Sequence, residues 1–486
     1  MAHSVLLPGA MLTSRSFATA LLLSLAPFTF ACDDVETGDQ DNITDVKNST
    51  VKNQSIGNCW VYATLGWAES LHLAQTGEEL NMSESWISYW HWYEEIAGGP
   101  PGQSSIAQLD KGQISTGGWF GLGGELMRRY GVISEGSFIP EESEAARSSR
   151  QSSALNAINE SLKNGALKEA SARKDRKLVR KELDKAWGLS PSTTALIDQV
   201  FGADVSRSLL KSGMSIPADS TLKYTKEVSV GHKISLADAI GEPSSSFNVL
   251  QRKGKYAWNE VSYPTSASSR RDVLKKMQKS MHAGMPVIMV WFVDFAGMDS
   301  KNQFLAPPTT PGRQGGHMTV VEDYQASNVP GFGTLAAGTL VTDQKALDAA
   351  LSSEAVIDFI RIKNSWGTSL APPKANDDQR GYYDLYKAYL DGPITKCTES
   401  NGDKCGIKSK TPGLTGLVLP PDAFVTDAVV KEAECSDICI AGPARAPGCD
   451  ECTDLICSED AFCCNNSWDD VCVNSANSIC ELSCGG

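Results

Sequence analysis

The cysteines of this 486-residue chain are distributed very unevenly, and this constrains its organisation more than any other feature. Ten of the 14 lie between Cys435 and Cys484, two form a close pair, and two stand alone. The pair is Cys397 and Cys405, and the isolated cysteines are Cys32 and Cys59. A segment of about 50 residues is too small to be held together by an apolar core, so disulfides would act as staples. We therefore predict a separate cysteine-rich module over residues 432–486 of an exported protein.

A zinc site is the alternative for this module, because Cys449 and Cys452 form a C-x-x-C motif. The module has no second motif of this kind and no histidine. Disulfides are therefore favoured, and the adjacent Cys463 and Cys464 are expected to pair with other cysteines rather than with each other.

The first 31 residues have the pattern of an export signal. Arg15 precedes an apolar run from Phe17 to Phe30, which is too short to span a membrane. Cleavage after Ala31 would leave Cys32 as the first residue, as in a bacterial lipoprotein whose cysteine carries a lipid. Simple secretion after cleavage at the same bond is the equal alternative, so the predicted location is secreted or lipid-anchored at the bacterial cell surface.

Residues 32–50 are rich in acidic side chains, lack apolar periodicity and are predicted to form a solvated tether. The whole chain has a formal net charge of −14, which would repel phosphates. Nucleic acid is therefore excluded as an expected partner.

Three segments after the tether have helical spacing of apolar residues. A helix is expected to begin at Cys59 and end near Gly77, and further helices are expected over Ser83–Trp90 and Glu125–Tyr130. Residues 141–260 are predicted to be an insertion, helical in its first part. A peripheral helical hairpin is the favoured interpretation; a lid, a wall of a cleft and an assembly surface are the alternatives.

From about Gly284 the pattern changes to strands. PVIMVWFVDF is a buried run, while HMTVVEDY and VIDFIRIKN alternate between apolar and polar residues. Residues Pro412–Pro421 have the composition of a connector. The fold class is therefore α+β, with a helical first half and a β-rich second half.

Three motifs carry the chemistry. VKNQSIGNCWVYAT places Cys59 at the start of a helix, GGHMTVVEDY places His317 on a strand, and IRIKNSWGT places Asn364 at a strand end. A helix N-terminus stabilises negative charge, and a nearby imidazole can accept the thiol proton. A side-chain amide can orient that imidazole. This set of side chains is suited to nucleophilic attack on a carbonyl by a thiolate.

The three motifs, in this order, resemble those of papain-like cysteine peptidases. The resemblance spans residues 51–390 without the insertions. The loop before Cys59 has Ser55 and Ile56 where the family carries a disulfide cysteine, and this loss resembles the bleomycin-hydrolase branch more than the cathepsins. It implies a two-lobed fold, with a helical lobe and a β-barrel-like lobe, over residues 51–425. It also implies Cys59 as nucleophile and His317 as general base.

The resemblance assigns the remaining site residues as well. Asn364 would orient the imidazole, Trp366 would cover that bond, and Gln54 would donate to the oxyanion. Gly117 and Gly118 would line the substrate cleft, although an ordinary turn is as consistent with their sequence.

The predicted function is hydrolysis of peptide bonds in peptides or proteins through an acyl-enzyme, with no metal and no cofactor. One alternative is acyl transfer to an amine by the same residues, as in a transamidase, and another is a papain-like protein that binds without catalysis. The sequence gives no prediction of oligomeric state, substrate preference or endo- against exopeptidase action.

Overall fold

The computed structural model describes residues 48–76, 79–102, 104–143, 147–207, 224–225, 229–230, 234–235, 258–368, 380–397, 400–401, 404–406, 408–420, 438–443, 445, 451–460, 462–465, 467–480, 482 and 484. The chain divides into two units, residues 1–37 and 38–486, and all described residues belong to the second. The predicted signal peptide, the lipid-acceptor Cys32 and most of the predicted tether therefore lie outside the described residues. The predicted domain boundaries stay predictions.

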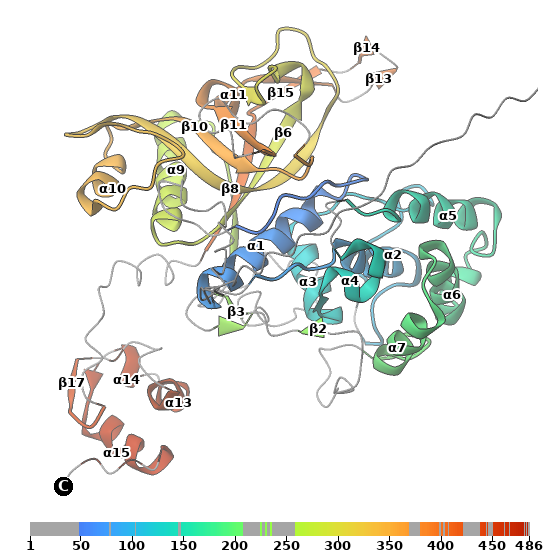
Figure 1. The fold of residues 1–486 in the computed structure, drawn as a ribbon, viewed down its shortest axis with the longest axis horizontal. Coiled ribbons are helices and arrows are strands. Elements are labelled where there is room, and N and C mark those ends of the chain that lie inside the picture. Colours follow the sequence, from blue (N-terminus) through green and yellow to red (C-terminus); the bar gives the residue numbers. More distant parts are fainter. Residues whose placement is uncertain are drawn as a thin grey trace, which may run out of the picture. The chain divides into compact units, whose positions relative to one another are not determined.

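The first part of the described chain is helical (Figure 1). Helix α1 spans Cys59–Thr76, α2 spans Glu84–Ala97 and α3 spans Phe120–Tyr130. The three predicted helices are confirmed, α1 with the expected bounds and α2 and α3 with longer ones. The Ser83 side chain caps α2 by accepting a hydrogen bond from the backbone N–H of Trp86. The aromatic residues of α2 are buried, which places this helix at the centre of the helical core.

Three further helices follow, α5 (Gln151–Asn164), α6 (Arg176–Trp187) and α7 (Pro191–Phe201). Asp175 caps α6 through its side chain, and Ser190 caps α7 just before Pro191. Their apolar faces belong to the same core as α1–α3, with Trp187 fully buried against Trp92. The helical content predicted for the first part of the insertion is confirmed. Each of these helices buries one face in this core and exposes the other, and the peripheral-hairpin interpretation stays a prediction.

The second part is built on one sheet whose strand order is β5-β16-β6-β8-β10-β11-β7, with β9 pairing with β8. The pairs are antiparallel except β11 with β7. The bounds are β5 Asn259–Ser262, β6 Val287–Asp294, β7 Gln303–Phe304, β8 Gln314–Val329, β9 Gly333–Leu335, β10 Val356–Lys363, β11 Tyr382–Tyr386 and β16 Leu414–Leu419. The three predicted strands are thus confirmed as β6, β8 and β10.

Two sheet elements correct the sequence-based expectations. Strand β16 lies between β5 and β6, whereas its residues were expected to form a connector. Strand β5 begins at the end of the region expected to be an insertion, which includes its first two residues, Asn259 and Glu260. Helix α9 (Ala267–His282) contacts β6 and β16 and contributes Met277 and Met281 to the core of the sheet.

The other regular elements are short. They are β1 Val132–Ile133, α4 Glu135–Phe138, β2 Tyr224–Thr225, β3 Ser229–Val230, β4 Ile234–Ser235, α10 Gln344–Ala350, α11 Lys387–Asp391, β12 Ile394–Cys397, β13 Ser400–Asn401, β14 Lys404–Cys405 and β15 Lys408–Thr411. The helical part and the sheet meet where α1 packs against β8. The predicted α+β class, helical first and β-rich second, is confirmed.

The cysteine-rich C-terminal segment has its own small core, which includes Ile456, Trp468 and Ala476. Its elements are β17 Gly442–Pro443, α13 Glu451–Glu459, α14 Phe462–Asn465, β18 Ser467–Trp468 and α15 Asp470–Ile479. The disulfides described here are Cys439–Cys484, Cys452–Cys480, Cys457–Cys464 and Cys463–Cys472, and a further disulfide joins Cys397 to Cys405. The adjacent cysteines therefore pair with other partners, as predicted.

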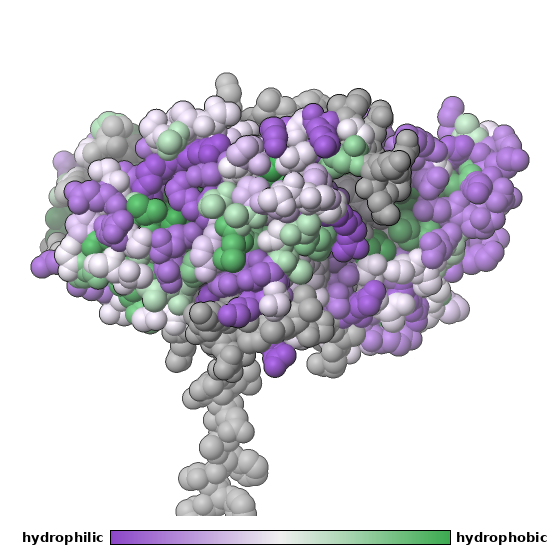
Figure 2. All heavy atoms as spheres, turned by 90° about the horizontal axis from the view of Figure 1, so that it is seen from above, coloured by the Kyte–Doolittle hydropathy of each residue, from purple (hydrophilic) through white to green (hydrophobic). Residues whose placement is uncertain are grey.

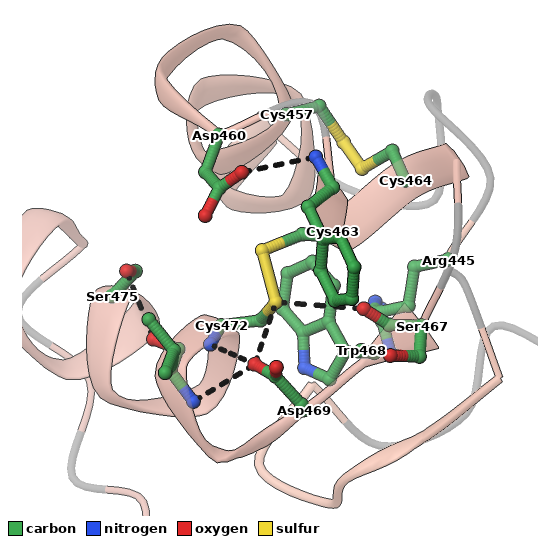
Figure 3. Close-up of a disulfide and its surroundings, with 12 residues drawn as sticks. Arg445, Cys457, Asp460, Cys463, Cys464, Ser467, Trp468, Asp469, Cys472 and Ser475 are labelled. Carbon is green, nitrogen blue, oxygen red and sulfur yellow. Dashed lines mark hydrogen bonds between the residues drawn. A yellow bond between two sulfur atoms is a disulfide. The ribbon is translucent and has the colours of Figure 1, made fainter.

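The Cys463–Cys472 disulfide packs beside the Trp468 ring (Figure 3). The guanidinium of Arg445 lies 5.1 Å from the centre of that ring, and the Asp469 side chain caps α15 by accepting from the backbone N–H groups of Val471 and Cys472. Disulfides and one aromatic side chain thus replace the large apolar core that so short a segment lacks.

Figure 2 shows one face of the molecule, on which hydrophobic residues gather in several separate patches among hydrophilic ones. Among the helices of the described part, none combines the length and apolar character needed to cross a membrane.

Candidate active site

Cys59 is the first residue of α1, and its side chain is partly exposed. It is the only cysteine with a free thiol among the described residues. The unpaired N–H groups of a helix N-terminus favour a negative charge on this sulfur. The position therefore suits a thiolate.

The surroundings of the Cys59 thiol act on its pKa in opposite directions. Burial raises this pKa, whereas the backbone N–H groups of Met318, Trp60 and Cys59 itself lower it by hydrogen bonding to the sulfur. Met318 follows His317 on β8, so the thiol lies against the strand that carries the imidazole.

His317 and Asn364 are joined by a hydrogen bond of 2.7 Å between Nε2 of the imidazole and Oδ1 of the amide. The backbone N–H of Ser365 donates to the same Oδ1 at 2.8 Å, which identifies this atom as the amide oxygen. Nε2 of His317 must then carry the proton, and Nδ1 is left as an acceptor. Burial lowers the pKa of His317 to about 4, while the bond to Asn364 acts to raise it.

Two indole rings enclose the imidazole. Trp366 is stacked on His317, with 4.7 Å between ring centroids and 21° between planes. Trp291, which lies opposite His317 in the β6–β8 pairing, contacts it edge-on at 5.4 Å. These rings shield the hydrogen bond between His317 and Asn364 from water.

Gln54 is fixed by the segment that follows Asn364. Its backbone N–H donates to the carbonyl of Ser365 at 2.8 Å, and the Ser365 hydroxyl donates to Oε1 of Gln54 at 2.6 Å. The Gln54 amide nitrogen donates to the Ile56 carbonyl at 2.9 Å. The amide is therefore held at both ends in the loop that leads to Cys59.

The predicted cleft glycines lie beside the start of α1. A Cβ on Gly118 would meet the Trp60 ring at 2.3 Å, so a larger residue cannot occupy this position without displacing the ring. The indole N–H of Trp60 donates to the Thr116 carbonyl at 2.9 Å. Gly117 is exposed, and the nearest atom to a Cβ there would be 3.8 Å away. The segment thus forms an open edge next to Cys59.

A buried pair on α2, Glu95 and His91, supports the segment that carries Gly117 and Gly118. The sequence did not reveal this pair. Glu95 accepts a hydrogen bond from the backbone N–H of Ser115 at 3.0 Å, and Nε2 of His91 lies 3.4 Å from the same carboxyl group. Burial raises the pKa of Glu95 to about 9 and lowers that of His91 to about 3. Both side chains are therefore neutral near pH 7, and their contact is not an ion pair. The His91 ring also contacts Trp60 edge-on at 5.0 Å.

Buried charges also lie on the segment that precedes Gln54. The ammonium of Lys52 is 2.9 Å from Glu84 and 3.2 Å from Glu135. Burial opposes the charge on Lys52, but the surrounding glutamates raise its pKa above the ordinary value. Burial and the neighbouring Glu84 raise the pKa of Glu135 to about 8. This cluster attaches the segment to α2 and α4.

The structure thus brings together the predicted residues on three separate segments. These segments carry Gln54 and Cys59, His317, and Asn364 with Trp366. Gly117 and Gly118 lie on a further segment, next to Trp60. Ser365, Glu95 and His91 were missed, because their contacts join segments whose proximity leaves no local sequence signal. Among the described residues, no three His, Cys, Asp or Glu side chains are grouped so as to hold a metal ion.

Comparison with known proteins gives one family match and several structural ones. A family model described as a domain of unknown function (DUF8252) matches residues 433–484. No curated protein matches the chain. The solved structures that match include cysteine peptidases, as their descriptions state.

Three of these structures illustrate the likeness. PepW from Lactobacillus rhamnosis is 12% identical with a TM-score of 0.36, and the match covers 79% of this chain and 83% of that one. Xylellain, a cysteine protease from Xylella fastidiosa, is 10% identical with a TM-score of 0.30, covering 78% and 84%. The bromelain protease from Ananas comosus is 13% identical with a TM-score of 0.26, covering 77% and 93%.

Proposed function

We propose that the chain is a cysteine peptidase in which Cys59 is the nucleophile and His317 the general base. The observation that carries this proposal is the 2.7 Å bond between Nε2 of His317 and Oδ1 of Asn364. Because this bond places the proton on Nε2, Nδ1 is free to accept the thiol proton. The backbone N–H of the very next residue, Met318, acts to lower the pKa of the Cys59 thiol, and α1 packs against β8.

The reaction begins when the Cys59 proton passes to Nδ1 of His317, which forms a thiolate and an imidazolium. The sulfur attacks the substrate carbonyl, and a C–S bond forms while the carbonyl oxygen becomes an oxyanion. When the oxyanion collapses, the C–N bond breaks and His317 gives its proton to the leaving amine. Water, deprotonated by His317, then cleaves the thioester and releases the carboxylic acid.

Two donors serve the oxyanion in this proposal, the backbone N–H of Cys59 and the side-chain amide of Gln54. One N–H of that amide is engaged by the Ile56 carbonyl, and the other is assigned to the oxyanion. Such a donor is worth about 3 kcal/mol of transition-state stabilisation when it is already in position. The Ser365 hydroxyl keeps Oε1 of Gln54 turned away from the oxyanion.

The resemblance to the papain-like family, and within it to the bleomycin-hydrolase branch, belongs to this proposal. So does export, because the described disulfides suit an oxidising compartment and the first 31 residues have the pattern of a signal peptide. The mature protein would be secreted, or attached to a membrane by a lipid on Cys32. Its partners would be peptides or proteins and not nucleic acid.

The test uses mature protein beginning at Asp33 and its Cys59→Ala variant. Both are incubated with an epoxide probe that alkylates activated thiols, and then with a mixed peptide library. Labelling and cleavage by the wild type alone support the proposal. If folded, reduced wild-type protein is neither labelled nor active, the chain is a binding protein with a papain-like site. If added amines appear in the products in place of water, the enzyme is a transamidase.

A further inference from the structure

A line of stacked side chains leads away from His317 and ends in a cation. Trp366 is stacked on the imidazole at 4.7 Å, and Phe295 lies against Trp366 at 5.0 Å with 33° between planes. The guanidinium of Arg313 lies over the Phe295 ring at 4.3 Å. These separations place the guanidinium within about 14 Å of the imidazole.

The backbone gives a second estimate of this spacing. Arg313 immediately precedes β8, and its carbonyl accepts a hydrogen bond from the backbone N–H of Phe295 at 3.0 Å, which continues the β6–β8 pairing. Side chains alternate along a strand, so Arg313, Gly315 and His317 share one face. Four residues of extended chain span about 13 Å, in agreement with the stacking distances.

The strand between Arg313 and His317 is open on this face. Gly315 has no side chain, and a Cβ built on it would meet no atom within 4 Å. An extended peptide can therefore approach the strand between the imidazole and the guanidinium.

The turn that carries Arg313 is held in a fixed shape. One carboxylate oxygen of Asp294 accepts from the backbone N–H groups of Gly312 and Ala296, each at 3.0 Å, and the other accepts from the Gln314 amide at 2.6 Å. A Cβ on Gly312 would lie 2.8 Å from the Cβ of Ala296, so the two segments are in close contact. A rigid turn lowers the entropy cost of presenting the guanidinium to a ligand.

The charge of Arg313 is not neutralised within the described part of the chain. Its side chain is exposed, and no described carboxylate lies within 4.0 Å of it. Asp294, which pairs across the strands with the adjacent Gln314, is fully buried and occupied by its three donors. A guanidinium stacked on a ring still has the N–H groups at its edge available for a carboxylate.

We propose that Arg313 and Phe295 form a subsite for a carboxylate on the leaving-group side of the scissile bond. This proposal rests on the proposed peptidase function. The leaving amine must reach Nδ1 of His317, so the residues that follow it extend over the imidazole and the stacked rings. At 3.3–3.4 Å per residue, about 14 Å is the length of roughly four residues of extended chain. Because this distance is an upper limit, the carboxylate belongs to the second to fourth residue beyond the bond. The carboxylate is that of a Glu or Asp side chain, or the C-terminal carboxylate of the substrate.

The test compares peptides identical except for Glu or Gln at the third position after the scissile bond, each with a free or an amidated C-terminus. We expect kcat/KM to be about five- to tenfold higher for the carboxylate, and the preference to weaken in high salt. Arg313→Gln removes the preference and Arg313→Glu reverses it. Lys396→Gln is the matched control, because Lys396 is also an exposed cation over a phenyl ring, that of Phe292 at 5.6 Å.

If replacing Glu by Gln lowers kcat/KM, the carboxylate is that of the side chain. If amidating the C-terminus lowers kcat/KM, it is the C-terminal carboxylate. Equal cleavage of all four peptides by the wild type, or a preference that survives Arg313→Gln, overturns the subsite while leaving the peptidase function intact. Calorimetry measures the binding of the same peptides to the Cys59→Ala variant and to the double variant Cys59→Ala with Arg313→Gln. This experiment tests the subsite without catalysis. The calorimetry separates failure of the subsite from failure of the peptidase function. A preference for the Glu peptide over the Gln peptide that is present in the first variant and absent from the second requires only Arg313 and no catalysis.

Discussion

Gln54 and Ser365 form two hydrogen bonds with each other, from the Gln54 backbone N–H to the Ser365 carbonyl and from the Ser365 hydroxyl to Oε1 of Gln54. The contact joins the loop before Cys59 to the residue after Asn364. It holds the proposed oxyanion donor and the group that orients the imidazole in one unit.

Gln54→Ala should lower kcat by about 10²- to 10³-fold with little change in KM, because the lost donor acts on the transition state. Ser365→Ala should have a smaller effect in the same direction, since it leaves the amide in place but less constrained. Steady-state kinetics on a neutral peptide measures both. An unchanged kcat in Gln54→Ala would show that the Gln54 amide does not donate to the oxyanion.

The reactivity of Cys59 at low pH should depend on His317. Burial raises the pKa of the thiol and lowers that of the imidazole to about 4, so each group alone would be neutral at pH 6. A thiolate at pH 6 then requires transfer of the thiol proton to the ring. In His317→Ala, we expect iodoacetamide alkylation at pH 6 to slow at least about tenfold and to recover only as the pH rises towards the raised thiol pKa.

Counting total thiols after denaturation controls for oxidation of Cys59 in this experiment. Equal alkylation rates of the two proteins between pH 5 and 7 would show that the imidazole does not activate the thiol.

The glycine pair offers a matched comparison. Gly118→Ala should impair the cleft, because its Cβ would meet the Trp60 ring at 2.3 Å, whereas Gly117→Ala should be tolerated, because the nearest atom is 3.8 Å away. Overpacking of this kind costs about 1–3 kcal/mol and would also shift the ring beside Cys59. Thermal unfolding and KM distinguish the two variants, and identical behaviour would contradict the packing described here.

Glu95→Gln should stabilise the protein increasingly as the pH rises. The pKa of Glu95 is raised to about 9, so between pH 4.5 and 9 the folded protein keeps a proton that the unfolded chain has released. The contribution of Glu95 to the free energy of unfolding therefore falls as the pH rises, by at most about 1.4 kcal/mol per pH unit. Glutamine resembles the neutral acid and can still accept from the Ser115 N–H.

Urea unfolding of the wild type and Glu95→Gln at pH 5 and pH 8 measures this difference. We expect the variant to gain in relative stability at pH 8. A relative loss at pH 8 would mean that Glu95 is ionised in the folded state.

The Cys463–Cys472 disulfide joins α14 to α15 beside Trp468. Replacing both cysteines by alanine should destabilise the C-terminal segment by about 2–5 kcal/mol, and proteases should then degrade it. Because this segment has its own core, we expect cleavage of a short peptide to be unaffected. Limited proteolysis with an activity assay tests both expectations, and loss of activity would show that the segment supports the site.

The sequence predicted those features that local patterns encode. The alternation in β8 and β10 and the helical spacing after Cys59 gave the correct elements, because period and burial coincide there. Strand β16 was missed since the stretch from Pro412 to Pro421 has the composition of a connector, although the residues of the strand are almost all buried. Strand β5, its partner, is only four residues long and follows a long segment without a clear pattern.

Tertiary contacts explain the other differences. The helical character of the region that contains α6 was visible in the sequence, but not the side chains that this helix covers, such as Trp92 of α2. The His317–Asn364 pair followed from its motifs, whereas the Glu95–Ser115 bond depends on how α2 packs beneath the cleft segment. No local pattern records such a contact.

The bond between the Ser365 and Gln54 side chains joins residues 311 positions apart, which has a consequence for the nascent chain. Synthesis proceeds from the N-terminus, so Cys59 leaves the ribosome long before His317, Asn364 and Ser365 exist. The helical part can fold around the cysteine, but the thiol has no proton acceptor and Gln54 has no anchor until the later strands arrive. A partial chain is therefore inert, and the order of translation itself delays the onset of activity until Ser365, at position 365 of 486, has been synthesised.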